Sequence, residues 1–309
     1  MALTEKLSHK QREALFNDTE TARQYIEKMR WPDGKPVCPH CGCVDDVYRL
    51  TPKAASKSPA RLGVLKCKHC RKQFTVTVGT IFEGSHIPLN KWLQAIYFMC
   101  TRKKGISAHQ LHRMMGVTYK SAWFMVHRIR HAMFDDAKKP LIEGTIEADE
   151  TYVGGKGRGK RGRGTSKPPV FSLIERNGKA RSYHVDNVKG STLTAIMNDN
   201  VNIKSQVMTD SYKAYNPKHQ QVDHSREYIR GTVHTNFAES YFSLLKRVIL
   251  GTFHYVSKTH LQRHLDEFDF RWSTRKITDD ERMAKAVIQI EGKRFYYRDS
   301  SESGFETCT

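Results

Sequence analysis

The sequence predicts a multidomain α+β protein, in which a small metal-held β module and three short helices precede an α/β domain with a mixed sheet. Three features support this prediction: paired cysteine motifs between Cys38 and Cys70, helix-forming segments after them, and strand-forming segments with embedded acids beyond position 144. The 309 residues are enough for about two to four compact units, at roughly 100 to 200 residues per domain.

The chain is strongly basic: it has 52 Lys and Arg, 32 Asp and Glu, and a formal net charge of +20. This charge indicates a polyanionic partner, which is either a nucleic acid or an anionic membrane surface. No stretch approaches the roughly 18 consecutive apolar residues of a membrane helix, and the N-terminus has no apolar signal core. We therefore expect a soluble intracellular protein that binds nucleic acid and no membrane.

The metal-held module is predicted from two CxxC motifs, because five of the seven cysteines lie in this one region. Such clustering is typical of a metal site and not of a disulfide framework. Four thiolates give the tetrahedral coordination that Zn²⁺ prefers, so we expect a structural zinc ribbon that needs the metal to fold. The predicted zinc ligands are Cys38, Cys41, Cys67 and Cys70. Cys43, His40 and His69 are interpreted as bystanders, since the four-cysteine set is complete without them.

Three helices are expected next, because apolar residues recur at helical spacing and Gly116 can form a turn. Ser107 and Thr118 can cap the second and third helices. This is the helix-turn-helix arrangement, whose last helix enters the major groove of DNA. The expected buried stripe of the last helix is Ala122, Val126, Ile129 and Met133. Outward-facing DNA contacts are predicted at Lys120, Trp123, His127 and Arg128.

Beyond position 144 the pattern changes to that of an α/β domain. Residues 144–153 alternate as a strand that carries Asp149, and Asn177-Gly178 is a strong hairpin signal because both positions tolerate positive φ. A short helix, a buried strand ending at Asp210 and a long amphipathic helix from Asn236 to about Ile249 follow. This order of elements is that of an RNase H-like fold.

Asp149 and Asp210 are candidate metal ligands, because both lie at strand positions beside apolar residues. A carboxylate in a buried strand is costly unless it is paired or metal-bound. Glu147 shares the predicted face of Asp149 and Glu150 lies opposite it, so either could be mistaken for the ligand.

The late helix places Asn236, Glu239 and Lys246 on one polar face, since steps of three and seven residues nearly close whole turns. Taken alone, this face could also be an ordinary solvated surface. The apolar face is expected to pack on the sheet through Phe237, Tyr241, Leu244, Leu245 and Val248.

A glycine-rich basic loop over residues 154–168 holds cations and no acid. A flexible, solvated loop is the simplest interpretation, and it is compatible with an arm that follows DNA phosphates. The predicted phosphate contacts of this arm are Lys156, Arg158, Lys160, Arg161 and Arg163.

Together these motifs resemble the ISXO-like DDE transposases of bacterial insertion sequences, which join a zinc ribbon and a helix-turn-helix to an RNase H-like DDE domain. The likeness covers about residues 20 to 276 and includes the paired cysteines, the strand around Asp149 and the helix around Glu239. It implies a DNA transposase that binds the terminal inverted repeats of an insertion sequence, hydrolyses phosphodiester bonds and transfers strands. It also implies a homodimer or higher assembly on double-stranded DNA, at the nucleoid in the bacterial cytoplasm.

Carried over residue by residue, the resemblance makes Asp149 and Asp210 the first two catalytic acids, as ligands of Mg²⁺ or Mn²⁺. The third ligand in this group is either Asn or Glu, and this sequence offers both Asn236 and Glu239. The seven-residue step to Lys246 matches the usual DDE spacing and favours Glu239, with Asn236 as a neutral ligand or an orienting residue. Lys246 would then contact phosphate near the scissile bond. Two divalent ions held by such oxygens would activate the attacking oxygen and stabilise the leaving one.

Two other functions are open. A transposase-derived DNA-binding regulator would keep the zinc ribbon and the helices without catalysis, but it predicts the loss of an acid, and both strand aspartates are present. A tyrosine recombinase would form a covalent phosphotyrosine, and Arg263-His264 and Tyr296-Tyr297 are residue types that it would need.

The predicted organisation is an N-terminal helical segment, a zinc ribbon, a helix-turn-helix domain, a catalytic domain and a C-terminal extension. The corresponding ranges are 1–33, 34–84, 87–137, 143–276 and 277–309. The first segment is interpreted as one helix that stops at Trp31-Pro32, and the ribbon is expected to end in a strand from Gln73 to Val78. The polar tail from Asp299 is expected to be disordered.

Overall fold

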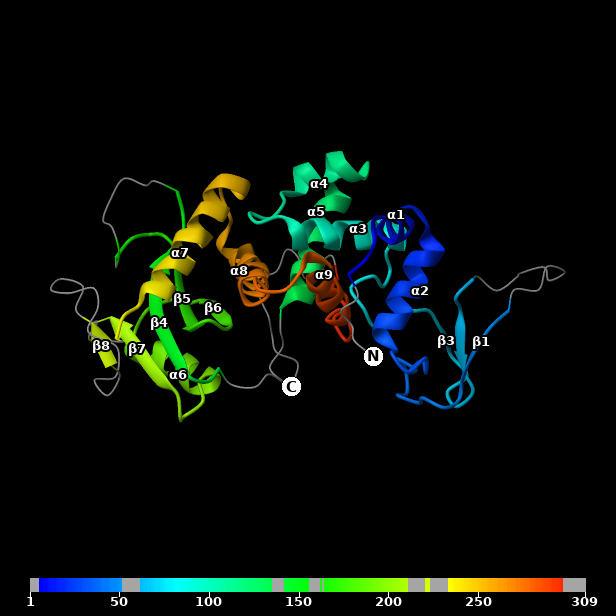
Figure 1. Cartoon of the computed structure of the whole chain (residues 1–309), viewed down its shortest axis with the longest axis horizontal. Helices are drawn as coiled ribbons and strands as arrows, with labels where there is room; N and C mark the ends of the chain where they lie inside the picture. Colours follow the sequence, from blue (N-terminus) through cyan, green and yellow to red (C-terminus); the bar gives the residue numbers. More distant parts are fainter. Residues whose placement is uncertain are drawn as a thin grey trace. The chain divides into compact units, whose positions relative to one another are not determined.

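The computed structural model describes residues 6–51, 62–134, 142–155, 162, 164–210, 220–222 and 233–296 (Figure 1). The chain divides into two compact units. The first unit comprises Met1–Met133 and Ile277–Ser300, and the second unit comprises Phe134–Lys276 and Ser301–Thr309. The first unit therefore combines the N-terminal region with a segment that follows the second unit in the chain.

The N-terminal region forms two helices, α1 (His9–Asn17) and α2 (Thr19–Arg30), and not the single helix expected from the sequence. The break lies at Asp18, whose backbone is extended and whose Oδ2 accepts a hydrogen bond from the backbone N–H of Thr21 at 2.7 Å. Such a cap satisfies an amide that would otherwise lack a partner, so Asp18 begins a new helix. The predicted stop is present, because α2 ends immediately before Trp31-Pro32.

A three-stranded antiparallel sheet follows, in the order β1-β2-β3, formed by β1 (Val47–Arg49), β2 (Leu65–Cys67) and β3 (Gln73–Phe74). β3 is shorter than the strand predicted to reach Val78. The reason lies in Arg30, whose Nη1 donates to the carbonyls of Val76 at 2.6 Å and Val78 at 3.2 Å. Because a side chain satisfies these carbonyls, the segment turns and needs no neighbouring strand.

Three helices follow the ribbon, namely α3 (Leu89–Thr101), α4 (Ala108–Met115) and α5 (Tyr119–Met133). Both predicted caps are present: Ser107 Oγ accepts from the N–H of Gln110, and Thr118 Oγ1 accepts from the N–H of Ser121, each at 3.2 Å. Gly116 forms the predicted turn with a left-handed backbone, φ 62°. The predicted stripe of α5 is buried at Ala122, Val126, Ile129 and Met133.

The late segment of the first unit contains α9 (Asp279–Ile288), which packs against α2, α3 and α5. Met283 and Val287 lie one turn apart on α9 and are fully buried. The sequence placed this segment in an extension over residues 277–309, whereas the structure makes it part of the core of the first unit. The tail from Asp299, predicted to be disordered, lies outside the described residues.

The second unit is built on a mixed sheet, as the sequence predicts, and this sheet has five strands in the described part of the chain, of which β8 was not predicted. Its strands are β4 (Thr145–Tyr152), β5 (Pro169–Glu175), β6 (Ala180–His184), β7 (Gln206–Asp210) and β8 (Gln220–Val222). The order across the sheet is β6-β5-β4-β7-β8, with antiparallel pairing from β6 to β4 and parallel pairing from β4 to β8. The β5–β6 hairpin turns at Asn177, whose φ of 62° matches the predicted turn signal.

Helices cover both faces of this sheet, and side chains alternate between the two faces along each strand (Figure 1). On one face, α6 (Gly190–Asn200) packs on Ile146, Ala148, Phe171 and Leu173. On the other face, α7 (Asn236–Val248) and α8 (Lys258–Ser273) pack on Val170 and Ile174. By the same alternation, Glu147 and Asp149 of β4 lie on the face toward α7.

α7 buries one stripe, formed by Ala238, Tyr241, Phe242, Leu245 and Val248. Phe242 takes the place that the sequence assigned to Leu244, which is 39% exposed. Each residue advances a helix by about 100°. On this geometry Phe242 falls within the arc of the buried stripe, and Leu244 falls just outside it. A short π-helical turn, η1 (Ile249–Phe253), continues α7. No helix among the described residues has the length and apolar character needed to cross a bilayer.

Candidate active site and metal centre

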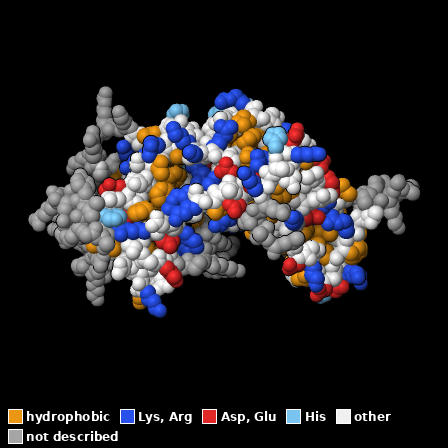
Figure 2. Space-filling model, in the orientation of Figure 1, with side chains coloured by type: hydrophobic (Ala, Val, Ile, Leu, Met, Phe, Trp, Pro, Cys, Tyr) orange, Lys and Arg blue, Asp and Glu red, His pale blue; other side chains and the backbone are white. Residues whose placement is uncertain are grey.

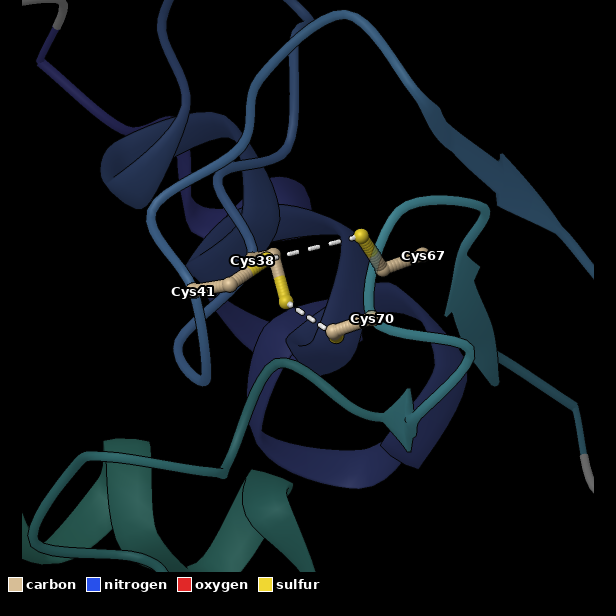
Figure 3. Close-up of side chains that lie close together, drawn as sticks. All are labelled: Cys38, Cys41, Cys67 and Cys70. Atoms are coloured by element: carbon tan, nitrogen blue, oxygen red, sulfur yellow. Dashed lines mark hydrogen bonds between the residues drawn. The ribbon is translucent and has the colours of Figure 1, made fainter.

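The predicted four-cysteine cluster is present in the first unit (Figure 3). All four sulfur atoms lie within 4.8 Å of one another. The Sγ atoms of Cys38 and Cys70 are 3.6 Å apart, and those of Cys41 and Cys67 are 3.7 Å apart. A tetrahedron with Zn–S bonds of about 2.3 Å has sulfur atoms about 3.8 Å apart. The cluster therefore has the size and the donor atoms of a structural zinc site.

The titration of two of these thiols reflects how closely they are packed. The backbone N–H of Cys70 is the main cause that lowers the pKa of Cys67 to about 7, which favours the thiolate. Although the backbone N–H of Cys43 acts to lower the pKa of Cys41, desolvation and the neighbouring thiols raise it to about 12. A bound cation would relieve this penalty, because a coordinating thiol loses its proton.

The second candidate site lies where β4 and β7 run side by side in the second unit. These strands are parallel, and their register pairs Glu147 with Met208 and Ala148 with Thr209. The next residues in this register are Asp149 and Asp210, so the two aspartates lie on adjacent strands and on the same face of the sheet. Both side chains are half-buried.

The environment of Asp149 is strongly acidic. Burial is the main cause that raises the pKa of Asp149 well above its usual value. The negative charges of Glu150, Asp210 and Glu239 raise this pKa further, against one hydrogen bond from the backbone N–H of Glu150 at 2.7 Å. Asp210 and Glu239 therefore both act electrostatically on Asp149, and carboxylate oxygens are the donors that hard cations such as Mg²⁺ prefer.

These acids are grouped more loosely than the cysteines. Within the part of the chain that the structure describes, only the four cysteines form a group of three or more His, Cys, Asp or Glu ligands close enough to hold one metal ion. Glu239 is exposed and lies in the first turn of α7, and Asn236 is the first residue of that helix. Repulsion between carboxylates favours such spacing, which a divalent cation would offset.

Lys246 lies near Asp149 and near a second cation, Lys167. Burial lowers the pKa of Lys246, the charge of Asp149 opposes this shift, and the charge of Lys167 adds to it. Lys246 is the cation that the sequence predicts for phosphate contact. Lys167 was not among the predicted site residues, although it stands at the end of the basic loop and its side chain lies across Gly154. The predicted loop contacts Lys156, Arg158, Lys160, Arg161 and Arg163 lie outside the described residues.

Glu147, which the sequence left as a possible ligand, is fully buried and bonded to α7. Its Oε2 accepts hydrogen bonds from the backbone N–H groups of Phe237 at 2.7 Å and Ala238 at 3.0 Å. Its Oε1 lies 2.7 Å from Nε of Arg176 and 3.1 Å from Nδ1 of His234. Both oxygens are therefore used within the protein.

A buried polar network holds the middle of α7. Ser172, the register partner of Asp149, lies 2.8 Å from Ser182, whose Oγ lies 2.7 Å from the hydroxyl of Tyr241. Asp269 of α8 accepts hydrogen bonds from Tyr241 and from Ser182 Oγ at 2.9 Å. α7 is therefore fixed to the sheet by directional bonds as well as by apolar packing.

The polar face of α5 is less open than predicted. Lys120 is exposed and Trp123 is half-buried, as a contact surface requires. His127 and Arg128 are buried, so the prediction that they face outward is wrong. Arg128 donates through Nη1 to two backbone carbonyls of residues 81–83, at 2.6 and 2.9 Å, and burial lowers its pKa to about 10. Helical spacing alone could not show that irregular backbone next to α5 needs a donor.

Basic side chains form several groups on the face drawn in Figure 2, and acidic side chains lie between some of these groups. This distribution agrees with the net charge of +20 and with a polyanionic partner.

Comparison with known proteins identifies the family. A model of the ISXO2-like transposase domain matches residues 141–273, and a model of the transposase zinc-ribbon domain matches residues 17–73. A Halobacterium salinarum protein described as an uncharacterized protein in transposable element ISH50 is 32% identical over 289 residues, covering 83% of this chain and 91% of its own length. No solved structure matches the chain. The chain is thus a transposase that belongs to the ISXO2-like family.

Proposed function

We propose that this transposase binds the terminal inverted repeats of an insertion sequence and catalyses metal-dependent phosphodiester hydrolysis and strand transfer with Asp149, Asp210 and Glu239. The observation that carries the proposal is that Asp149 and Asp210 lie on adjacent parallel strands and on the same face of the sheet, where the charges of Asp210 and of Glu239 on α7 both raise the pKa of Asp149. The strand order β6-β5-β4-β7-β8, with helices on both faces, supports an RNase H-like catalytic domain.

The residues around the acids support a reaction at a phosphate. When bound, Mg²⁺ held by Asp149, Asp210 and Glu239 would supply Lewis acidity to the reacting oxygens. Lys246 and Lys167 provide positive charge for a DNA phosphate beside the acids. Hydrolysis at the element's end frees a 3′ hydroxyl. In-line attack of that hydroxyl on a target phosphodiester would form a new phosphodiester bond and displace the target strand's 3′ oxygen, with the same groups used again. Because two ends are joined to one target, we propose that at least two copies assemble on the DNA.

The test of this proposal is incubation of the full-length protein with its own element's ends and Mg²⁺, followed by mapping of the cleaved bond. Cleavage at the end with a free 3′ hydroxyl is expected. End binding without cleavage would instead indicate a DNA-binding regulator, and a covalent protein–DNA adduct would indicate a tyrosine recombinase.

The third ligand is expected to be Glu239. A carboxylate adds a full negative charge toward a divalent cation, whereas the amide of Asn236 adds a dipole. Glu239→Gln should therefore raise the Mg²⁺ requirement sharply and nearly abolish cleavage, while Asn236→Ala should retain weak activity that extra metal partly restores. A metal titration of strand cleavage in the two variants measures this. A dead Asn236→Ala beside an active Glu239→Gln would make Asn236 the third ligand.

We propose that α3, α4 and α5 form a helix-turn-helix whose last helix reads the terminal repeat through its N-terminal turns. Recognition helices contact base edges through their N-terminal residues, and in α5 this is the part that stays accessible.

Lys120→Ala is expected to weaken binding to the element's ends. If Lys120 contacts phosphate, the slope of log affinity against log salt should also fall by about one unit. Binding isotherms at several salt concentrations measure both effects. Lys28→Ala, at an exposed position on α2, is the matched control. Equal affinities and slopes in the two variants would exclude Lys120 from the interface.

A further inference from the structure

We propose that Glu147 is a positioning residue, which aligns α7 with β4 and so sets the spacing between Glu239 and Asp149. The inference rests on the proposed function, because it assigns Glu147 a task within that same site. Glu147 itself stays away from metal and DNA, since its side chain is completely buried.

The first step of the argument is the N-terminus of α7. The first amides of a helix have no partner within the helix, and a capping side chain usually satisfies them. Thr235 occupies the N-cap position of α7 but makes no side-chain cap bond. Glu147 supplies this cap from a neighbouring strand, because its Oε2 accepts from the amides of Phe237 and Ala238. Its negative charge also lies at the positive end of the helix dipole.

The second step concerns the two segments that these hydrogen bonds join. Glu147 is two residues before Asp149 on β4, and residues two apart on a strand share a face. Ala238, which donates to Glu147, is followed directly by Glu239. One carboxylate therefore joins the strand segment that carries Asp149 to the helical turn that carries Glu239. The network around Tyr241 holds the middle of α7, so Glu147 decides the placement of its first turn.

The third step is the charge balance of Glu147. A buried carboxylate needs a paired cation, and Arg176 at the β5–β6 turn provides it through Nε at 2.7 Å. Arg176 also donates through Nη2 to the backbone carbonyl of His234 at 3.0 Å, which fixes the chain where it enters α7. Arg176 therefore orients both the carboxylate and the segment that the carboxylate caps. Mutation of residues that hold metal ligands in place typically lowers metal affinity or activity by about 10- to 100-fold.

The decisive variant is Glu147→Gln in the full-length, zinc-loaded protein. Gln keeps the shape but replaces one acceptor oxygen with a donor, which must face either Arg176 or the amides of α7. We expect Mn²⁺ binding, followed by electron paramagnetic resonance, to weaken by about 10- to 100-fold. The Mn²⁺ midpoint for cleavage should rise in parallel, and saturating metal should restore part of the activity. If Glu147 had a purely structural role, the variant would lower the amplitudes of the Mn²⁺-binding curve and of the cleavage curve without moving their Mn²⁺ midpoints.

Glu175→Gln is the matched control, because Glu175 lies at the same hairpin and its side chain accepts, among the contacts described, only from the backbone N–H of Lys179 at 3.1 Å. Arg176→Lys is the second variant if Glu147→Gln fails to fold, since Lys keeps the charge but lacks the fork that reaches both Glu147 and His234. It should shift the Mn²⁺ midpoint in the same direction.

Midpoints of Glu147→Gln or Arg176→Lys that equal those of Glu175→Gln would overturn the inference, as would a wild type that binds no Mn²⁺. A wild type that binds Mn²⁺ but cleaves no element end would contradict the proposed function alone. In that case a shifted Mn²⁺ affinity in Glu147→Gln still supports the positioning role.

Discussion

Asp149→Asn is expected to abolish strand cleavage, to leave binding to the element's ends intact and to make the metal-free protein more stable. The variant lacks a carboxylate of the proposed metal site, and removal of one group that stabilises transition-state charge costs about 10²- to 10³-fold in rate. Stability rises because burial and three nearby acids disfavour the charged form of Asp149, and Asn is neutral. A gain of about 1 kcal/mol corresponds to about 2 to 4 °C in Tm for a domain of 150 to 250 residues.

The difference in stability between Asp149→Asn and the wild type should depend on pH. The pKa of Asp149 is raised in the folded protein, so its charged form destabilises the fold above that pKa. As pH falls through the raised pKa toward the ordinary value of about 3.9, Asp149 becomes protonated in the fold and the penalty disappears. The gap in Tm between Asp149→Asn and wild type should therefore be widest near neutral pH and should narrow as the pH is lowered.

Thermal unfolding in chelator at several pH values, together with cleavage and end-binding assays, measures these effects. Asp199→Asn is the control, because Asp199 is exposed on α6 across the sheet and should change neither activity nor the pH trend. Asp210→Asn should lose cleavage in the same way. Retained cleavage in either aspartate variant, or a destabilised Asp149→Asn, would contradict this account of the site.

Cys67→Ser is expected to release zinc and to unfold the ribbon. Structural zinc supplies about 10 to 16 kcal/mol of apparent binding free energy in small zinc modules, far more than the short strands β1 to β3 can replace. Metal analysis should find about one zinc per chain in the wild type and none in the variant. Binding to the element's ends should weaken as well, because Arg128 of α5, the proposed reading helix, donates to the backbone carbonyls of Ile81 and Glu83 at the end of the ribbon region.

The control for the zinc experiment is Cys43→Ser. The Sγ of Cys43 is outside the cluster, and its backbone carbonyl accepts from the N–H of Cys38 at 2.9 Å, a bond that serine preserves. Cys43→Ser should keep full zinc content and normal unfolding. Zinc loss in this variant, or zinc retention in Cys67→Ser, would show that the ligand set differs from the four predicted cysteines.

Local rules predicted much of the fold. Caps at Ser107 and Thr118, the hairpin turn at Asn177 and the strand around Asp149 all depend on residues close together in the sequence, and each is present. The cysteine cluster could also be predicted from the sequence, since ligand type and spacing define a zinc ribbon.

Features that depend on distant partners were not predictable. Arg128 has the spacing of a surface cation, and only the carbonyls near position 81 make it a buried donor. Glu147 and Asp149 share a face of β4, so alternation could not separate a ligand from a residue that caps α7. The core position of α9 could not be inferred either, because its partners α2 and α3 lie far away in the chain.

The inclusion of α9 in the first unit has a consequence for how the protein is made. Domains generally fold as units during synthesis, starting from the N-terminus. Here the first unit lacks a buried helix until residues 279–288 have left the ribosome, by which time the whole second unit has also been translated. A nascent chain interrupted within the second unit cannot complete the core around Met283 and Val287. Under the proposed function, prematurely ended translation products would thus be poor competitors for the element's ends, and each molecule able to occupy an end would also carry the three proposed catalytic acids.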